Sequence, residues 1–391
     1  MKYRIAFVHR GLTKYRFPLF KKLLSNSKIN FRVFHQYFNS SPSNVGFSQP
    51  NNEEISKYPI TRITCSRLHT LFYNKLGLAL PSFKLISAVI KYNPEIIVLE
   101  SLSNIGNVLT LTPYILLKKK PFIWWGLGAI PRRKNTLRSS IGDLLQSWYV
   151  KRSVCVLSYA TFGKEYFVSI GSDPNKVKVL YNTIDEKQVE DNINNCRPLV
   201  REIKRELKIS DQPVAIFSGT INKGKKLDLL LRSFSRVIDE IKDMDPRLIV
   251  IGDGTEFDNC ENISKKLNIT SSVHFVGRQE DKASAYFLIG QIAIMPGLGG
   301  LGINHAFAHK LPMICGNADG CEYDLVVNDK TGFLIEEMNE LNLSKKIIKL
   351  LSNKKLSNEL GKNAYKLITS KISMNKMANR IENAIENAYN I

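Results

Sequence analysis

The sequence has few cysteines, and none of them form a Cys-x-x-Cys pair. The six are scattered along the chain, at Cys65, Cys155, Cys196, Cys260, Cys315 and Cys321. Zinc sites, redox motifs and disulfide frameworks use closely paired or regularly spaced cysteines. We therefore expect reduced, structural thiols, as in proteins of the cytoplasm, and no metal site built on cysteine.

The sequence also lacks a hydrophobic run long enough to span a membrane. The longest uncharged apolar stretch, residues 105–117, is interrupted by Pro113 and followed by Lys118, Lys119 and Lys120, whereas a spanning helix needs about 20 apolar residues. The first residues, MKYRIAFVHR, alternate as a strand does and show no leader pattern. Because no nucleic-acid module or tandem aromatic platform is recognised, we expect a cytoplasmic protein without a nucleic-acid partner.

Short apolar runs alternate with longer amphipathic stretches, which indicates an α/β fold with parallel sheets. The 391 residues are too many for one hydrophobic core. We expect a Rossmann-like domain over 1–190, a second over 191–371, a final helix over 372–391, and a linker in the polar segment 185–212. Strands are expected at 3–8, 29–35, 96–99, 121–125, 153–157 and 177–181, and then at 213–218, 247–251, 273–276, 291–295 and 312–315.

The formal charge of +21 is concentrated in the first half of the chain. Residues 1–191 contain 28 Lys and Arg against 11 Asp and Glu, or +17, and the remainder contains 28 against 24, or +4. Trp124 and Trp125 lie between Lys118–Lys120 and Arg132–Lys134, as in proteins that lie on anionic bilayers. Packing in the core is the alternative, and it is favoured for Trp124, whose alternation with Ile123 is typical of a strand. We expect peripheral attachment to the inner face of the cell membrane. A phosphorylated substrate or simple solubility are the alternatives.

A glycine-rich segment follows the apolar run 292–295, with Gly297, Gly299, Gly300 and Gly302 just before a short helical pattern. The absence of four side chains lets backbone N–H groups approach an anion closely. The segment therefore predicts a phosphate-binding loop. A tight turn that needs positive φ angles is the alternative.

Lysines cluster at the corresponding place after the run 213–218. Gly219 permits a sharp exit from the strand, and Lys223, Lys225 and Lys226 precede an amphipathic helix. A lysine held beside a glycine at such a turn suits a pyrophosphate group. A solvated charge run is the alternative.

In order and spacing, these motifs resemble the C-terminal domain of the retaining GT-B glycosyltransferases called group 1 or family 4. The resemblance covers the whole chain and is best from about residue 150 to 335. The Pro-Gly-x-x-Gly-Leu loop followed by His-Ala-Phe-Ala resembles a branch found in bacterial surface-polysaccharide assembly. The matching positions are Asn182, Asp185, Gly219, Thr220, Ile221, Lys225, Gly252 to Gly254, Val273, Phe275, Gly277, His305 to Ala308, Pro312, Gly320, Glu322 and Thr331 to Phe333.

The resemblance implies an α/β GT-B fold of two doubly wound Rossmann-like domains facing a central cleft, with C-terminal helices returning toward the N-terminal domain. It also implies a hexosyltransferase that moves a sugar from a nucleotide-diphosphate donor to a glycan, or lipid-linked glycan, with retention and without metal or cofactor. Lys225 would stabilise the leaving diphosphate. The donor-binding residues would be Gly219, Thr220, Lys223, Gly297, Gly299, Gly300, Leu301, Asn304, His305 and Glu322.

Two features depart from the family pattern. The family usually has two glutamates eight positions apart where this sequence has Gly297 and His305, and Thr220 replaces an arginine for which Lys223 is close enough to substitute. A catalytically silent scaffold protein therefore stays an alternative, as does a nucleotide-sugar epimerase or phosphorylase on the same fold. We expect His305 to bind the ribose or base and His309 to be a packing residue.

The acceptor is expected at the carboxyl ends of the N-terminal strands, because doubly wound sheets bind ligands there. Members of this branch carry a Tyr-Arg-x-Pro-x-Phe motif at the first helix, which corresponds here to Tyr15, Arg16, Pro18 and Phe20. Arginines at this edge would hold an acceptor diphosphate; exposure to water alone is the alternative. The candidates are Arg10, Tyr15, Arg16, Gly126, Arg132 and Arg133.

Overall fold

The computed structural model of the protein describes residues 3–25, 29–37, 50–66, 69, 71, 80–100, 102–133 and 136–389. Its internal contacts divide the chain into two compact units. Unit 1 comprises Met1–Tyr181 together with Met374–Ile391, and unit 2 comprises Asn182–Ser373. A segment from the far end of the chain thus belongs to unit 1.

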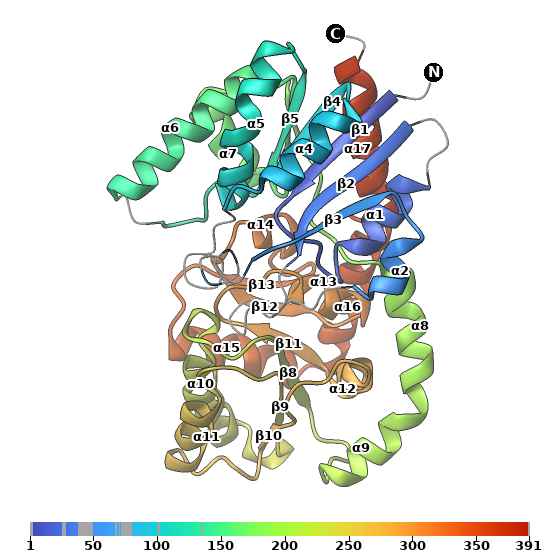
Figure 1. Ribbon diagram of the computed structural model, residues 1–391. Coiled ribbons are helices and arrows are strands. Elements are labelled where there is room, and N and C mark those ends of the chain that lie inside the picture. The colour runs from blue at the N-terminus through green and yellow to red at the C-terminus, as the bar shows by residue number, and fades with distance from the viewer. Residues whose placement is uncertain are drawn as a thin grey trace. The chain divides into compact units, whose positions relative to one another are not determined.

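Unit 1 is built on a seven-stranded parallel sheet in the order β3-β2-β1-β4-β5-β6-β7 (Figure 1). The strands are β1 (Tyr3–His9), β2 (Ile29–Tyr37), β3 (Ile60–Thr64), β4 (Ile96–Glu100), β5 (Phe122–Gly126), β6 (Cys155–Ser158) and β7 (Val177–Val179). The helices are α1 (Phe17–Leu24), α2 (Asn52–Ser56), α4 (Phe83–Tyr92), α5 (Ile105–Leu117), α6 (Leu137–Arg152), α7 (Thr161–Ser169) and α17 (Met374–Tyr389).

The central strands of this sheet are buried on both faces, and β1 shows the pattern. Ile5 and Phe7 pack in a core cluster with α1 and α17, whereas Ala6 and Val8 pack on the other face with α4, α5, α6 and α7. Side chains alternate in this way because a strand has a period of two residues. Strands covered on both faces read as continuous apolar runs, which explains why β4 and β5 are recognisable in the sequence.

The last helix, α17, completes one of these two cores. Met377, Ile381 and Ile385 are fully buried in the same cluster as Phe7 and Phe20. Arg380 donates a hydrogen bond from Nη1 to the carbonyl of Leu180 at 3.1 Å. The amphipathic pattern near the end of the sequence therefore covers the sheet of unit 1.

Unit 2 is built on a six-stranded parallel sheet in the order β10-β9-β8-β11-β12-β13. The strands are β8 (Val214–Ser218), β9 (Arg247–Ile251), β10 (Val273–Phe275), β11 (Ile292–Met295), β12 (Met313–Gly316) and β13 (Gly332–Ile335). The helices are α8 (Glu186–Cys196), α9 (Val200–Glu206), α10 (Leu227–Glu240), α11 (Phe257–Lys266), α12 (Ala283–Ile289), α13 (Gly302–Ala308), α14 (Glu322–Leu325), α15 (Glu340–Leu351) and α16 (Lys354–Ser370).

The expected strands are all present, and three expectations need correction. β3 and β13 were not anticipated as strands. The segment 185–212 is not a linker, because it forms α8 and α9. α8 buries Val189 and Cys196, and the Cys196 thiol donates to the carbonyl of Asp281 at 3.2 Å. Only one side of α8 is covered, which explains its polar composition.

Trp124 and Trp125 do not lie at a surface, so the core position favoured for Trp124 is confirmed and the expectation that Trp125 contacts a membrane is wrong. They are 0% and 1% exposed, and because they are neighbours in β5 they point into opposite cores. Trp124 stacks on Tyr149 with ring centroids 4.8 Å apart. All six cysteines are buried, as expected of structural residues. Within the described part of the chain, no helix combines the length and the apolar character needed to cross a bilayer.

Candidate functional site

The strand order of unit 2 reverses between β8 and β11, which lie side by side in the sheet. β8 connects onward to β9 on one side, whereas β11 connects onward to β12 on the other side. In doubly wound sheets, the loops at the carboxyl ends of two such strands diverge and leave a crevice for ligands. The lysine cluster follows β8 and the glycine-rich segment follows β11, so both predicted phosphate-binding segments begin at this point.

Lys225 connects these two loops. Its Nζ donates a hydrogen bond to the carbonyl of Leu298 in the glycine-rich loop. Its side chain also lies beside Gly219, where an added Cβ would be 3.5 Å from the lysine Cε. This is an ordinary contact distance, and what favours glycine at this position is its φ of 156°, which other residues rarely adopt. Thr220 is partly buried, whereas Lys223 and Lys226 are exposed.

The glycine-rich loop packs closely on the lysine turn through Gly297. A Cβ at this residue would lie 2.0 Å from the carbonyl oxygen of Gly224, which is far inside van der Waals contact. The next residue, Leu298, donates its backbone N–H to the same carbonyl at 3.0 Å. Further along, a Cβ on Gly300 would meet no atom within 4 Å. The loop is therefore tightly packed at its start and borders open space at Gly300.

Asp319 was not anticipated as a site residue, although it supports this loop. Its Oδ2 accepts the backbone N–H of Gly300 at 3.2 Å, and its carboxylate lies near Lys225. Burial lowers the pKa of Lys225, and the charge of Asp319 opposes this shift. Asp319 therefore favours the protonated, cationic lysine. Asp319 is 94 residues beyond Lys225 and belongs to no local motif, so the sequence alone does not indicate this role.

Glu322 is fully buried beneath the segment that presents Asp319. Its carboxylate accepts backbone N–H groups from Ala318 at 2.6 Å, Asp319 at 3.2 Å and Gly320 at 2.9 Å. Burial raises the pKa of Glu322, and these amide hydrogen bonds oppose the shift. With three amides bound, this carboxylate orients the loop that carries Asp319.

The short helix α13 begins after Leu301 and presents Asn304 and His305. Asn304 is buried, and its amide donates to the carbonyl of Asn182 at 3.2 Å. His305 is only partly exposed, and its burial lowers its pKa to about 4. Its imidazole is therefore neutral at pH 7 and offers one donor and one acceptor. His309 donates from Nδ1 to the His305 carbonyl at 2.7 Å and stacks on Phe287, so it packs inside the unit.

Unit 1 has an equivalent reversal of strand order between β1 and β4. Glu100, the last residue of β4, accepts the backbone N–H of Arg10 at 2.7 Å and pairs with its Nε at 3.4 Å. The same carboxylate lies 3.3 Å from Nδ1 of His9, which is also 2.8 Å from the carbonyl of Gly11. Burial lowers the pKa of His9, and Glu100 opposes the shift. His9 and Glu100 were not anticipated, because they are 91 positions apart.

The other expected acceptor residues lie in different environments. Arg16 is 3% exposed, and its guanidinium lies over the rings of Tyr15, Trp125 and Tyr159 at 5.2, 5.3 and 5.0 Å. In this structure Arg16 therefore holds the loop after β1 against the core. Arg132 is exposed.

Arg133 and Gly126 are also engaged within unit 1. Arg133 pairs with Asp143 and lies over the ring of Tyr166 at 5.3 Å. Gly126 is the last residue of β5 and pairs with Ser158 of β6. Of the expected acceptor set, Arg10 thus lies at the reversal point itself, next to His9 and Glu100, which were not expected.

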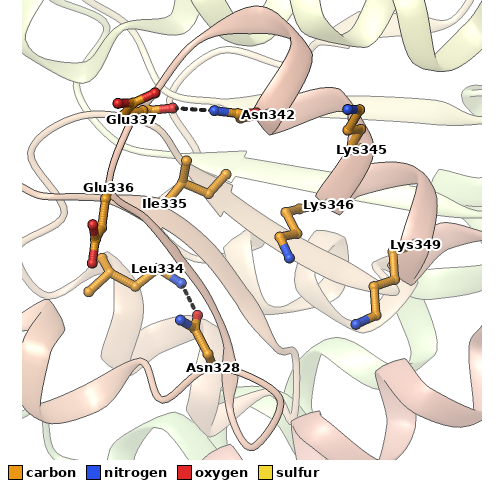
Figure 2. Close-up of a pocket in the computed structure, with 9 residues that line it drawn as sticks. All are labelled: Asn328, Leu334, Ile335, Glu336, Glu337, Asn342, Lys345, Lys346 and Lys349. Atoms are coloured by element: carbon orange, nitrogen blue, oxygen red, sulfur yellow. Dashed lines mark hydrogen bonds between the residues drawn. The ribbon is translucent and has the colours of Figure 1, made fainter.

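A surface hollow of about 490 Å³ lies elsewhere in unit 2, between β13 and α15. Figure 2 shows three α15 lysines on one side of it, with Leu334 and Glu336 on the other. Lys346 and Lys349 lie over the ring of Phe333 at 4.4 and 4.7 Å, and Lys349 pairs with Asp329 at 3.0 Å. No residue expected to bind the donor lines this hollow, so we do not assign it to the site.

Comparison with known proteins identifies the part of the chain that carries the β8 and β11 loops. Residues 200–367 match the sequence model of the family described as Glycosyl transferases group 1. This part of the chain is thus similar to a group 1 glycosyltransferase domain. Lys225, the glycine-rich loop and Asp319 all lie within the matched residues, which supports a GT-B glycosyltransferase.

Two curated relatives match parts of the chain. The chain is 24% identical to N-acetyl-alpha-D-glucosaminyl L-malate synthase of Bacillus anthracis over 213 residues, which is 54% of this chain and 53% of the relative. It is 30% identical to the capsular polysaccharide biosynthesis glycosyltransferase CapM of Staphylococcus aureus over 171 residues, which is 42% of this chain and 43% of the relative. The matches thus span about half the length of these relatives.

Solved structures match over nearly the whole chain. The glycosyltransferase from Rickettsia africae has a TM-score of 0.73 at 17% identity, with 100% of both chains covered. Anabaena Alr3699/HepE, solved with UDP, has a TM-score of 0.71 at 13% identity, with 99% of this chain and 100% of that chain covered. At these identities the likeness shows the fold, and it confirms the expected GT-B class with two Rossmann-like α/β domains.

Proposed function

We propose that this protein transfers a sugar from a nucleoside-diphosphate sugar to a glycan acceptor. The observation that carries the proposal is the position of Lys225, whose side chain joins the β8 and β11 loops at the reversal point of the glycosyltransferase domain. A cation fixed at this point suits a diphosphate leaving group. UDP and UDP-glucose in crystals of the structural neighbour HepE support a donor of this class.

The leaving group would be stabilised electrostatically. In the proposed donor complex, Lys225 faces the negative charge that develops on the diphosphate as the glycosidic bond breaks, with Lys223 close by in the same turn. One preorganised group of this kind typically lowers a barrier by about 3–4 kcal/mol. Asp319 contributes indirectly, because its charge favours the cationic lysine and its carboxylate binds the Gly300 N–H. His305 would bind the ribose or base as a neutral imidazole.

The acceptor is proposed to be a glycan, carried on a lipid and used in surface polysaccharide. The name of CapM supports a polysaccharide role. The acceptor would bind near Arg10, His9 and Glu100, at the reversal point of unit 1.

We further propose that transfer retains the donor configuration and needs no divalent metal. An Asp-x-Asp sequence of the kind that binds metal in other transferases does occur, at Asp243 and Asp245. It lies in the turn before β9, at the opposite edge of the sheet from the crevice, and Asp245 pairs with Arg247. Activity should therefore persist in EDTA, and NMR of the first-formed product should show the donor anomeric configuration. Activity that is lost in EDTA and restored by manganese would contradict metal independence.

The test begins with a thermal-shift screen of nucleoside diphosphates and nucleotide sugars, because selective binding stabilises the folded state. Lys225→Ala should lower turnover by about 100-fold or more, with the melting temperature nearly unchanged. Lys226→Asn is the matched control, since it removes the neighbouring charge, and asparagine tolerates the positive φ of 52° at that residue.

Three outcomes would overturn parts of the proposal. A Lys225→Ala variant within about threefold of the wild-type rate would move the diphosphate contact to Lys223 or Lys226. Isomerisation of the free donor without an acceptor would indicate an epimerase. Stabilisation by no nucleotide at all would indicate a silent scaffold protein.

A further inference from the structure

Exposed apolar side chains are concentrated on three neighbouring helices of unit 1. Sixteen large hydrophobic residues are exposed in the described part of the chain, and eight of them lie on α4, α5 and α6. We call this set the α4–α6 surface; its members are Phe83, Ile90, Leu109, Leu116, Leu117, Leu137, Ile141 and Leu144. Phe83, Leu117, Leu137 and Leu144 are each more than 70% exposed.

The spacing of these residues places them on the outer side of each helix. Leu137, Ile141 and Leu144 lie at i, i+4 and i+7 of α6, which is one face of a helix. Leu109 and Leu116 lie seven positions apart on α5. The inner sides of both helices are buried against the sheet. α5 and α6 therefore have apolar residues on two faces. A helix that only covers a sheet needs one apolar face, the one that packs on the sheet.

The three helices are in direct contact and lie on one face of the sheet, so their exposed residues belong to one side of unit 1 (Figure 1). The backbone N–H of Ser82, at the start of α4, donates to Asn107 of α5 at 2.9 Å. Thr112 of α5 and Tyr149 of α6 are joined by a hydrogen bond of 2.7 Å.

The charges of this side have one sign. In the segments 81–92, 102–120 and 136–152 the sequence contains a single acidic residue, Asp143, and it is paired with Arg133. The three helices connect parallel strands, so their C-terminal ends lie at the same edge of the sheet. Basic residues gather at these ends: Lys91, Lys118, Lys119, Lys120, Lys151 and Arg152.

We propose that the α4–α6 surface lies on an anionic lipid bilayer, with the leucine side chains in the interfacial region and the basic helix ends at the lipid phosphates. Apolar side chains flanked by lysine and arginine bind such surfaces. The positive charge of this side complements lipid phosphates, whereas the same side of a second copy would offer it almost no opposite charge. The proposal does not depend on the transfer chemistry, but it would place a lipid-linked acceptor within reach.

The test is flotation with phosphatidylcholine vesicles that do or do not contain phosphatidylglycerol. The wild type should float with the anionic vesicles and be released progressively by salt, because charge attraction is screened over about 8–10 Å. The combined variant Leu137→Ser, Ile141→Ser, Leu144→Ser should lose at least about tenfold in vesicle partitioning. The charge variant Lys118→Gln, Lys119→Asn should lose about tenfold or more.

The matched control changes three exposed apolar residues of unit 2, Met244→Ser, Val327→Ser and Leu341→Ser, and should float as the wild type does. Tryptophan fluorescence and the thermal shift with UDP show whether each variant is folded and binds donor, so loss of flotation is distinguishable from loss of transfer. Equal flotation of the leucine variant, or of the wild type with neutral vesicles, would overturn the proposal. A dimer in sedimentation that the leucine variant abolishes, without vesicle binding, would assign the surface to a second copy.

Discussion

Gly297 explains why one of the usual family carboxylates is absent. The resemblance places a glutamate at this position in other members, but here a Cβ would lie 2.0 Å from the Gly224 carbonyl. Any side chain would therefore push the glycine-rich loop away from the lysine turn. In this protein the backbone at Gly297 packs directly on the backbone at Gly224. The Lys225 side chain adds a hydrogen bond to the Leu298 carbonyl between the same two loops.

Gly297→Ala should lower the free energy of unfolding of unit 2 by about 1–3 kcal/mol, the usual cost of overpacking, and should weaken donor binding. Urea unfolding followed by circular dichroism and donor titration by calorimetry measure the two effects. Gly299→Ala is the control in the same loop, since the nearest atoms to its methyl group belong to side chains and not to backbone, with Ile303 at 3.1 Å. Equal loss in both variants would mean that the contact with Gly224 is not what matters.

His35 should make the stability of unit 1 depend on pH. It is 1% exposed in β2, and burial lowers its pKa from 6.5 to about 4. Between these values the unfolded chain takes up a proton that the folded chain does not. The free energy of unfolding should therefore fall as the pH falls from about 6.5 to 4, by roughly 1.4 kcal/mol per pH unit for one such histidine.

The measurement is urea unfolding between pH 7.5 and 5 for the wild type and His35→Gln. In the variant, the free energy of unfolding should fall less steeply with falling pH, because the contribution of one histidine is missing. This difference in slope does not depend on the stability of the variant at pH 7.5. His69→Gln, at a partly exposed residue, serves as the control. If the free energy of unfolding depended on pH equally in the wild type and in His35→Gln, the folded protein would bind a proton at His35 as readily as the unfolded chain does.

At the scale of secondary-structure elements, α17 is the last helix of the chain, yet it packs in the core of unit 1. Seven of its residues are buried in a core that otherwise comes from residues 5–180. Ile381→Ala should therefore lower the free energy of unfolding of unit 1 by about 2–5 kcal/mol. All three tryptophans, Trp124, Trp125 and Trp148, lie in unit 1, so their fluorescence during denaturation reports this unit alone.

Glu386→Ala, on the exposed side of α17, is the control for helix propensity and should change stability by less than about 0.5 kcal/mol. If Ile381→Ala were no more destabilising than this control, α17 would not be part of the cooperative core of unit 1.

For the molecule as a whole, sequence patterns predict most of the fold because its parallel strands are buried on both faces. β4 and β11 are continuous apolar runs and were located correctly. β3 has partly exposed residues throughout, so it lacks that signal. The helical pattern of α8 was obscured because its polar side dominates its composition.

The candidate site likewise contains residues that local sequence patterns predict and residues that they do not. Lys225 and the glycine-rich loop were predicted because each follows a recognisable strand and fits a known spacing. Asp319 and the pair formed by His9 and Glu100 depend on contacts between segments far apart in the chain, and no local pattern marks them. The outward position of Leu137, Ile141 and Leu144 likewise depends on which helix face meets the sheet.

The joining of α17 to unit 1 also fixes an order of events during synthesis. Unit 2 is one continuous stretch, 182–373, whereas unit 1 needs both 1–181 and 374–391. At about 5–20 residues per second, residues 3–181 emerge from the ribosome roughly 10–40 s before Ile381 and Ile385 do. Through that interval the sheet face that carries Phe7 and Phe20 stays without its last covering helix. The N-terminal half of the nascent chain is thus the part that a chaperone would need to bind, and the second unit can finish folding before the first.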